Sequence, residues 1–204
     1  MAKLKYTKNE LKRQKDDLKR FTRYLPTLVL KKQQLQLEII KTGQVIHEIE
    51  EELDKLVATI SPWVGVFAED VDIKNLIQIK ELCTTEENIA GIDIPVFEKI
   101  DFKQQQYDLR QTPLWVDFGI RAVKKVSIFK ARVFLLKRKQ GLLAEELRIT
   151  AQRVNLFEKL MIPQANDNIR KINIVLGDMQ TAAVVIGKIA KEKIEAKTEA
   201  MAGV

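Results

Sequence analysis

The residue types that carry out most enzyme chemistry are scarce in this sequence. Cys83 and His47 are each the single residue of their type, which leaves too few nitrogen and sulfur ligands for a zinc site. His47 lies in the acidic stretch "VIHEIEEELD" (45–54), where a solvated helix face is the simplest interpretation. Because Cys83 has no second cysteine to pair with, we expect a structural thiol and a reducing compartment.

Other arrangements that support catalysis are not predicted either. The glycines, at 43, 65, 91, 119, 141, 177, 187 and 203, never cluster into a phosphate-binding loop. Acid pairs such as Glu50 and Glu52 fall on a predicted surface helix with no pocket around them. We therefore predict no catalytic residue, no metal site and no cofactor, and a function in mechanics, scaffolding or recognition.

The elements that position these residues follow from a heptad repeat in the first 60 residues. Eight of nine positions are apolar in the series Leu4, Leu11, Leu18, Leu25, Lys32, Ile39, Ile46, Leu53 and Ile60. Five of eight are apolar in the companion series Thr7, Gln14, Phe21, Leu28, Leu35, Thr42, Ile49 and Leu56. A repeat sustained over so many heptads predicts a coiled-coil helix, which Pro26 is expected to loosen locally.

The segment after Ser61-Pro62 has a different pattern. Short apolar alternation in "WVGVFAE" (63–69) and "GIDIPVFEKIDF" (91–102) predicts two strands of a hairpin or small sheet, with Pro95 marking an edge. The stretch "DIKNLIQIKEL" (72–82) is ambiguous between helix and strand, and "KQQQYDLRQTP" (103–113) is predicted as a loop.

A second long helix is predicted after Pro113, again with a heptad seam. Nine of eleven seam positions are apolar between Val126 and Met161. The spacing then changes to steps of four, through Phe157, Met161, Ala165 and Ile169, before a seam continues through 172, 176, 179, 183 and 186. Such an insertion is a stutter, which unwinds the supercoil locally. Pro163 lies within it, so register change and proline affect the same turn.

Charge predicts how the two helices pair. Residues 48–54 contain five acids, whereas residues 121–139 contain eight Lys or Arg and no acid. If the chain folds back so that Ile60 lies near Val126, these stretches run side by side in an antiparallel pair. We predict a mainly α fold, a long antiparallel two-helix coiled coil with a small β segment at its turn, each helix roughly 90 Å long. It forms one elongated domain from residues 1–60, 61–113 and 114–204.

The end that carries both termini is predicted to be basic, because residues 1–32 contain eleven Lys or Arg against three acids. This end is interpreted either as a solvated tip, as a surface that docks into an acidic or polar protein cavity, or as a nucleic-acid site. Few aromatic residues accompany the bases, which disfavours nucleic acid. The N-terminus is charged throughout, unlike a signal peptide. The longest purely apolar run, "AAVVI" (182–186), is too short to span a bilayer.

One region of the second helix resembles a known family. The pattern "RVNLFEKLMIP" (153–163), followed by Ile169, Ile172, Leu176 and the lysines of 188–193, is similar to the C-terminal motif of the D subunits of V-type and archaeal-type rotary ATPases. The stretch "LVLKKQQL" (28–35) resembles the family more loosely, since Val29 and Gln33 replace the usual Lys and Asp, and the usual Pro-Thr-Arg start is missing. These departures indicate a divergent bacterial branch.

The resemblance implies a non-catalytic central rotor stalk that transmits torque between a catalytic ring and a membrane ion-translocating ring, for ATP synthesis or for ATP-driven proton or sodium transport. It implies as partners the catalytic A and B subunits around the termini, a small F subunit on the coil, and a funnel-shaped subunit capping the membrane ring. It implies no nucleic acid, no membrane insertion, and a cytoplasmic location peripheral to the inner membrane. The partner-binding residues carried over from the motif are Arg153, Asn155, Glu158, Pro163, Lys188 and Lys191.

Two alternatives stay open on the sequence. One is a coiled-coil stalk or chaperone of an export apparatus, although such proteins usually lack a β-rich middle segment. The other is a generic coiled-coil adaptor or rod that binds nucleic acid, which predicts salt-sensitive binding of DNA or RNA.

Overall fold

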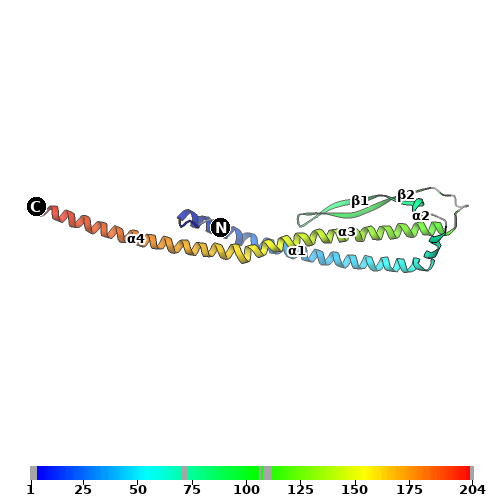
Figure 1. Cartoon of the computed structure of the whole chain (residues 1–204), viewed down its shortest axis with the longest axis horizontal. Helices are drawn as coiled ribbons and strands as arrows, with labels where there is room; N and C mark the ends of the chain where they lie inside the picture. The colour runs from blue at the N-terminus through cyan, green and yellow to red at the C-terminus, as the bar shows by residue number, and fades with distance from the viewer. Residues whose placement is uncertain (1–3, 70–72, 106, 108–111, 203–204) are drawn as a thin grey trace. The chain divides into compact units, whose positions relative to one another are not determined.

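The computed structural model describes residues 4–69, 73–105, 107 and 112–202 (Figure 1). Helix α1 (Lys8–Ile60) leads into a 3₁₀ segment, η1 (Ser61–Ala68), and a short helix, α2 (Ile73–Leu76). Strands β1 (Ile77–Ile89) and β2 (Ile92–Gln104) follow. The chain ends in α3 (Trp115–Leu156), a π turn, η2 (Phe157–Met161), and α4 (Ile162–Ala202). The predicted fold class, long helices with a small β segment between them, is confirmed.

Helix α1 begins at a local signal in the sequence. The Thr7 hydroxyl accepts a hydrogen bond from the backbone N–H of Glu10 at 3.3 Å, which satisfies one of the free N–H groups of the first turn. The Thr-x-x-Glu spacing is that of a capping box. Pro26 lies inside α1 without interrupting it, and the Thr27 hydroxyl donates to the carbonyl of Tyr24 one turn earlier, at 2.8 Å.

The contacts of the chain group into two compact units, one formed by residues 1–30 and 151–204 and the other by residues 31–150. In the first unit, Asn168 donates a hydrogen bond to Gln14 at 3.3 Å, and the rings of Phe21 and Phe157 are 5.3 Å apart. From the first contact to the second, the residue number increases on α1 and decreases on the partner helix, so the two helices run antiparallel. The prediction of one elongated domain with divisions at 60 and 113 stays a prediction.

The second unit shows the same antiparallel pairing. Lys31 forms an ion pair with Glu146 at 2.7 Å, and Lys137 forms one with Glu50 at 2.8 Å. The second pair joins the acidic stretch of α1 to the basic stretch of α3, which confirms the charge complementarity predicted from the sequence. Ile60 and Val126 line one cavity, as the predicted fold-back requires.

The heptad positions face inward along most of both helices. Leu35, Ile46, Leu143, Val154 and Ile172 are buried. All other predicted seam positions within α1 are at least half-buried, whereas Thr7, just before the helix, is exposed. The prediction is wrong at the C-terminal end, where Met179, Ala183 and Ile186 are exposed. Helix α1 begins at Lys8, so α4 beyond Leu176 has no described helix of this chain to pack against.

The β segment is a single antiparallel hairpin in which Ile89 pairs with Ile92. Its two turn residues, Ala90 and Gly91, have φ angles of 54° and 81°, as a two-residue type I′ turn requires. The Asn88 side chain accepts a hydrogen bond from the Gly91 N–H at 3.0 Å and donates one to Asp93 at 2.7 Å. Both strands of a two-stranded sheet are edges, which accommodates Pro95.

The position of the first strand corrects the sequence prediction. Residues 63–69 were expected to form a strand, but Ser61–Ala68 is a 3₁₀ helix, because Pro62 suits the start of a helix and Trp63, Val66 and Phe67 recur at helical spacing. The strand is instead Ile77–Ile89, within and beyond the ambiguous stretch. Its residues are mostly exposed on both faces, so the sequence shows no alternation there.

Two apolar clusters hold the hairpin on the helices of its unit. Near the turn, Ile94 packs with Leu35 of α1 and Leu143 of α3, and all three are fully buried. At the base, Ile77 packs with Val116 and Ile120 of α3. Between them, the guanidinium of Arg132 lies 5.2 Å from the ring of Phe97. The hairpin therefore lies along α3 (Figure 1) and is fixed at both ends.

Candidate partner-binding surfaces

The motif residues predicted from the family resemblance lie on the surface. Arg153, Asn155, Glu158 and Pro163 are at least partly exposed, whereas Val154 and Ala165, between and beyond them, are buried in the seam. Lys188 and Lys191 are exposed further along α4, and Lys191 forms an ion pair with Glu195 at 3.5 Å. The first four residues thus lie before, within and just after η2 (Phe157–Met161), and the two lysines lie far along the same helix. A partner-binding role for all six stays a prediction.

The stretch that contains these four residues includes the π turn η2. The N–H of Ile162 donates to the carbonyl of Phe157, five residues earlier, instead of four as in an α-helix. The residues that the sequence placed in steps of four, Phe157, Met161 and Ala165, all face inward. The stutter is therefore accommodated by a π turn, and Pro163 follows it directly. Turns of this kind are frequent at functional sites.

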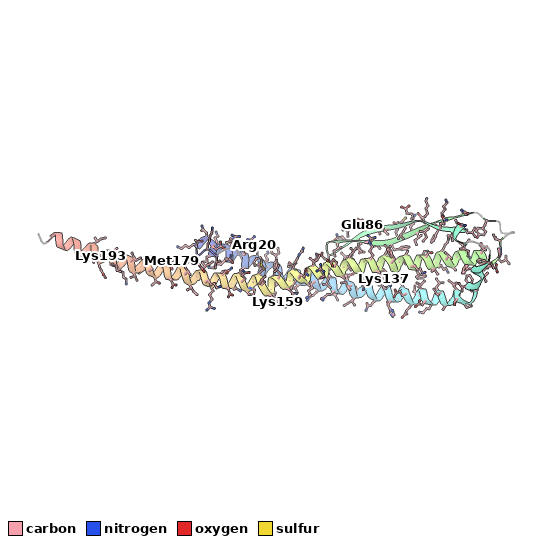
Figure 2. The ribbon with its side chains drawn as sticks, in the orientation of Figure 1. Arg20, Glu86, Lys137, Lys159, Met179 and Lys193 are labelled. Carbon is pink, nitrogen blue, oxygen red and sulfur yellow. The ribbon has the colours of Figure 1, made fainter. Side chains whose placement is uncertain are left out.

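A second surface is the part of α4 that lies beyond Leu176. The large apolar residues Met179, Val184, Val185, Ile186, Ile189 and Ile194 are all exposed there. Figure 1 shows α4 continuing past the start of α1, and Figure 2 labels Met179 and Lys193 along it. Exposed apolar area of this extent marks an interaction site. The stretch carries little net charge, because the lysines at 188, 191 and 193 are matched by acids at 178, 192 and 195.

Part of this long helix has the length and apolar composition of a membrane span. By length and composition alone, the continuous helix Trp115–Ala196 contains an 18-residue window apolar enough to cross a membrane, and 6% of that window is buried. The sequence prediction considered only uninterrupted apolar runs, and this window was missed because polar residues interrupt it. An exposed apolar helix face fits a protein partner as well as lipid, so this observation alone is weak evidence for a membrane span.

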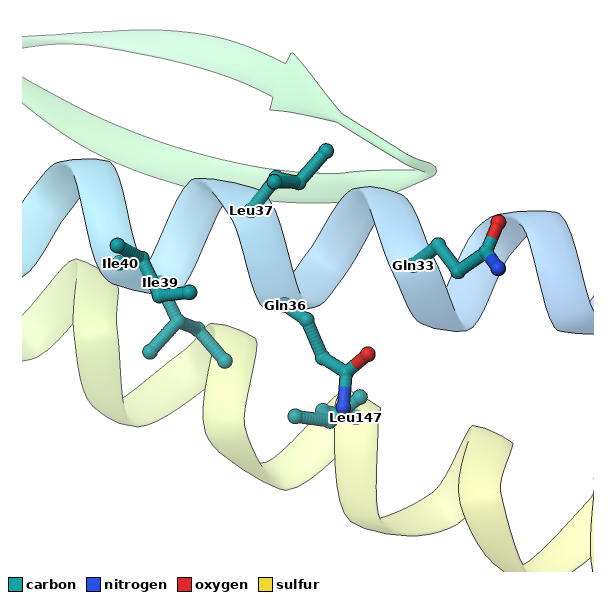
Figure 3. A pocket seen from close by; sticks show the side chains of 6 residues that line it. All are labelled: Gln33, Gln36, Leu37, Ile39, Ile40 and Leu147. Carbon is teal, nitrogen blue, oxygen red and sulfur yellow. The ribbon is translucent and has the colours of Figure 1, made fainter.

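A third surface lies on the side of the helical pair in the second unit. A groove of about 640 Å³ is lined by Gln33, Gln36, Leu37, Ile39, Ile40 and Leu147 (Figure 3). Leu37 and Ile40 are 57% and 58% exposed, and they lie outside the heptad seam. Apolar residues at such positions are not needed for a two-helix coil, so they indicate a third element that packs on α1.

A fourth surface, which was not predicted from the sequence, is a cavity of about 570 Å³ between the end of α1, η1 and the start of α3. It is lined by Leu56, Thr59, Ile60, Trp63, Val66, Trp115, Phe118, Arg121, Ala122 and Lys125. The available signal was that the two tryptophans lie close to the two ends of the predicted middle segment, residues 61–113. We refer to it as the aromatic cavity.

The single cysteine is placed as a structural thiol. Its Sγ lies 3.9 Å from Oδ2 of Asp101 on the neighbouring strand. Desolvation and the negative charge of Asp101 raise the pKa of the Cys83 thiol, so the reactive thiolate is disfavoured. Among the described residues, no group of three His, Cys, Asp or Glu side chains is arranged to hold a metal ion.

These observations define a class of protein: a helical hairpin that leaves extended apolar surfaces exposed. The model of the ATP synthase D-subunit family matches residues 10–192. The D subunit of a V-type ATP synthase from Borreliella burgdorferi is 51% identical over 194 residues, which cover 95% of this chain and 96% of that protein. Counterparts from Chlamydia caviae and Chlamydia abortus are 37% and 34% identical, over 97% of both chains in each case.

The chain therefore belongs to the ATP synthase D-subunit family, and it resembles bacterial members of that family. This confirms the resemblance drawn from residues 153–193. The match extends well beyond that motif, because it includes the hairpin and nearly all of α1.

Proposed function

We propose that this chain is the non-catalytic central rotor stalk of a V-type rotary ATPase and transmits torque between the catalytic ring and the membrane ring. The observation that carries this proposal is the stretch of α4 beyond Leu176, where a helix projects with apolar side chains exposed. Such a helix is stabilised by a surrounding protein, and a ring of catalytic A and B subunits provides one. The complex lies on the cytoplasmic face of the membrane, and this chain does not enter the lipid.

The pairing of the helices supports a mechanical role. Inward-facing seam residues recur from Leu11 to Leu56 on α1 and from Val126 to Leu176 on the other helix, so the paired helices of each unit resist twisting. The ion pairs Lys31–Glu146 and Lys137–Glu50 join the two helices of the second unit directly. A shaft needs such repeated contacts between its helices because torque applied at one end must not unwind the coil.

The remaining partners are assigned by surface chemistry. We assign the side groove around Leu37 and Ile40 to the small F subunit, because a helix with matching apolar spacing fits there. We assign the end of the second unit that carries η1 to the funnel-shaped subunit that caps the membrane ring. The motif residues Arg153, Asn155, Glu158 and Pro163 are proposed to contact the catalytic subunits, together with Lys188 and Lys191.

Direct observation of rotation tests the proposal. The exposed Glu86 of the hairpin (Figure 2) is changed to Cys in a Cys83→Ser background, and a bead is attached there. With catalytic A and B subunits fixed to a surface, ATP is expected to turn the bead in one direction. A bead that stays still while the fixed subunits hydrolyse ATP would refute torque transmission by this chain.

A matched pair of variants links rotation to the projecting helix. Ile186→Asp places a charge in the exposed apolar stretch of α4, where Ile186 is 66% exposed, and is expected to uncouple hydrolysis from rotation. Val57→Asp makes a similar change at an exposed position of α1 in the other unit and is expected to leave rotation unchanged. Equal effects of both variants would show that the stretch beyond Leu176 has no special role.

A further inference from the structure

The aromatic cavity is built as a rigid recess. The rings of Trp63 and Phe67 are 5.5 Å apart, and Phe67 meets Trp115 edge-on, also at 5.5 Å. Trp63 donates its indole N–H to the carbonyl of Thr59 at 3.1 Å. A Cβ at position 119 would approach the Phe67 ring to 3.0 Å, so Gly119 permits this close packing.

The second indole is fixed in the same way. Trp115 donates its N–H to the carboxylate of Glu69 at 2.8 Å. Both tryptophans therefore have hydrogen-bond partners inside the chain, and what they present to the cavity is apolar ring surface. Recesses that are already formed bind a partner with little loss of conformational entropy, and tryptophan is enriched among the residues that dominate binding energy.

The edge of the cavity is basic. Arg121 and Lys125 line it, and no lining residue is acidic. Arg121 lies 4.7 Å from the Phe118 ring and donates to the backbone carbonyl of Asp117, while the carboxylate of Asp117 accepts a hydrogen bond from the Tyr107 hydroxyl. Within the described part of the chain, no ion pair neutralises Arg121 or Lys125.

We propose that the aromatic cavity seats an apolar side chain of an acidic protein segment, whose carboxylates pair with Arg121 and Lys125. This inference rests on the proposed function, because the segment is assigned to the partner on the membrane side of the stalk. Charge complementarity determines the choice of partner: an apolar recess with two cations at its edge attracts an apolar anchor flanked by acids. Phe118, which is 62% exposed, becomes covered when the segment binds.

Two other occupants fit the cavity less well. A second copy of this chain would bring basic edges together, and the chain already has a net charge of +7. A lipid surface is recognised by aromatic side chains whose polar ends face the headgroups, whereas both indole N–H groups are bonded within the chain. A concave recess suits a protruding side chain better than a flat bilayer.

The test uses the detergent-solubilised ATPase complex purified through a tag on this chain. Phe118→Ala and the double variant Arg121→Glu/Lys125→Glu are compared with the wild type for retention of the catalytic and membrane sectors. Both are expected to keep the catalytic sector and its ATP hydrolysis, and to bind the membrane sector at least about thirtyfold more weakly. Raising the salt concentration should weaken binding of the membrane sector by the wild type. The ratio of wild-type binding to Phe118→Ala binding should stay the same.

Phe134→Ala is the matched control, since Phe134 is 61% exposed on the same helix outside the cavity, and it should behave as wild type. Retention of the membrane sector by Phe118→Ala at wild-type strength would overturn the cavity proposal. So would vesicle binding by the wild-type chain, with anionic phospholipid as the probe, if that binding required Phe118 and Arg121. Failure of the wild-type chain to retain the catalytic sector would instead overturn the proposed function.

Discussion

Replacing Pro163 by Ala separates the cost of a proline from the cost of the π turn that precedes it. A proline inside a regular helix is about 3 kcal/mol less favourable than alanine, partly because it removes an N–H donor. In η2 the hydrogen bonds have already shifted from four residues back to five, as the bond from Ile162 to Phe157 shows. Restoring the N–H at 163 therefore regains only part of that energy, and we expect Pro163→Ala to raise the free energy of unfolding by about 1 kcal/mol.

Pro26 provides the matched comparison for this prediction. Pro26 lies in the same compact unit as Pro163, but α1 is α-helical on both sides of Pro26. Pro26→Ala should stabilise the chain by the full amount, roughly 3 kcal/mol. Urea unfolding of both variants, followed by circular dichroism, measures the difference. Equal stabilisation by the two substitutions would show that the π turn does not accommodate Pro163.

Pro163→Ala also tests whether the catalytic subunits respond to the shape of the π turn. If the asymmetry at Pro163 lets those subunits distinguish rotational positions of the stalk, Pro163→Ala lowers ATP turnover that is coupled to rotation. Pro26→Ala leaves that turnover unchanged. Intact coupled turnover in a more stable Pro163→Ala stalk would remove the positional role and leave the proline as a feature that the stutter tolerates.

Three further predictions concern the interior and the thiol. Thr150 is 1% exposed, and its hydroxyl has no hydrogen-bond partner among the residues that the structure describes, so Thr150→Val should raise the unfolding free energy by about 1 kcal/mol. Thr42→Val should bring no gain in the same urea assay, because the Thr42 hydroxyl donates to a helix carbonyl at 2.7 Å. Leu143→Ala should cost about 3 kcal/mol through the cavity it leaves and should speed amide hydrogen exchange near the hairpin turn, whereas unchanged exchange would show that the hairpin is held elsewhere. Desolvation and the negative charge of Asp101 raise the pKa of the Cys83 thiol. Asp101→Asn should therefore lower that pKa and speed iodoacetamide labelling at pH values below it. An unchanged labelling rate at about pH 8, below the ordinary thiol pKa, would contradict the assigned cause.

The sequence alone determined the helical part of this protein. The spacing of leucine and isoleucine specified both seams and the stutter at Phe157–Ala165, because side chains on a helix recur on one face with a fixed period. The acidic stretch around Glu50 and the basic stretch around Lys137 specified antiparallel pairing. The pattern across residues 153–193 was enough to identify the family, although the partner contacts of its residues stay predictions.

The tertiary structure alone decided which apolar residues are covered. Strand β1 had no readable alternation because it is exposed on both faces and is held by β2 rather than by its own pattern. The periodic spacing of 179–186 predicted more seam, yet those residues are exposed because α1 does not reach them. The aromatic cavity joins Trp63 to Trp115, which are far apart in the sequence. Periodicity specifies the face on which a side chain lies, but only the three-dimensional fold determines whether another part of the chain covers that face.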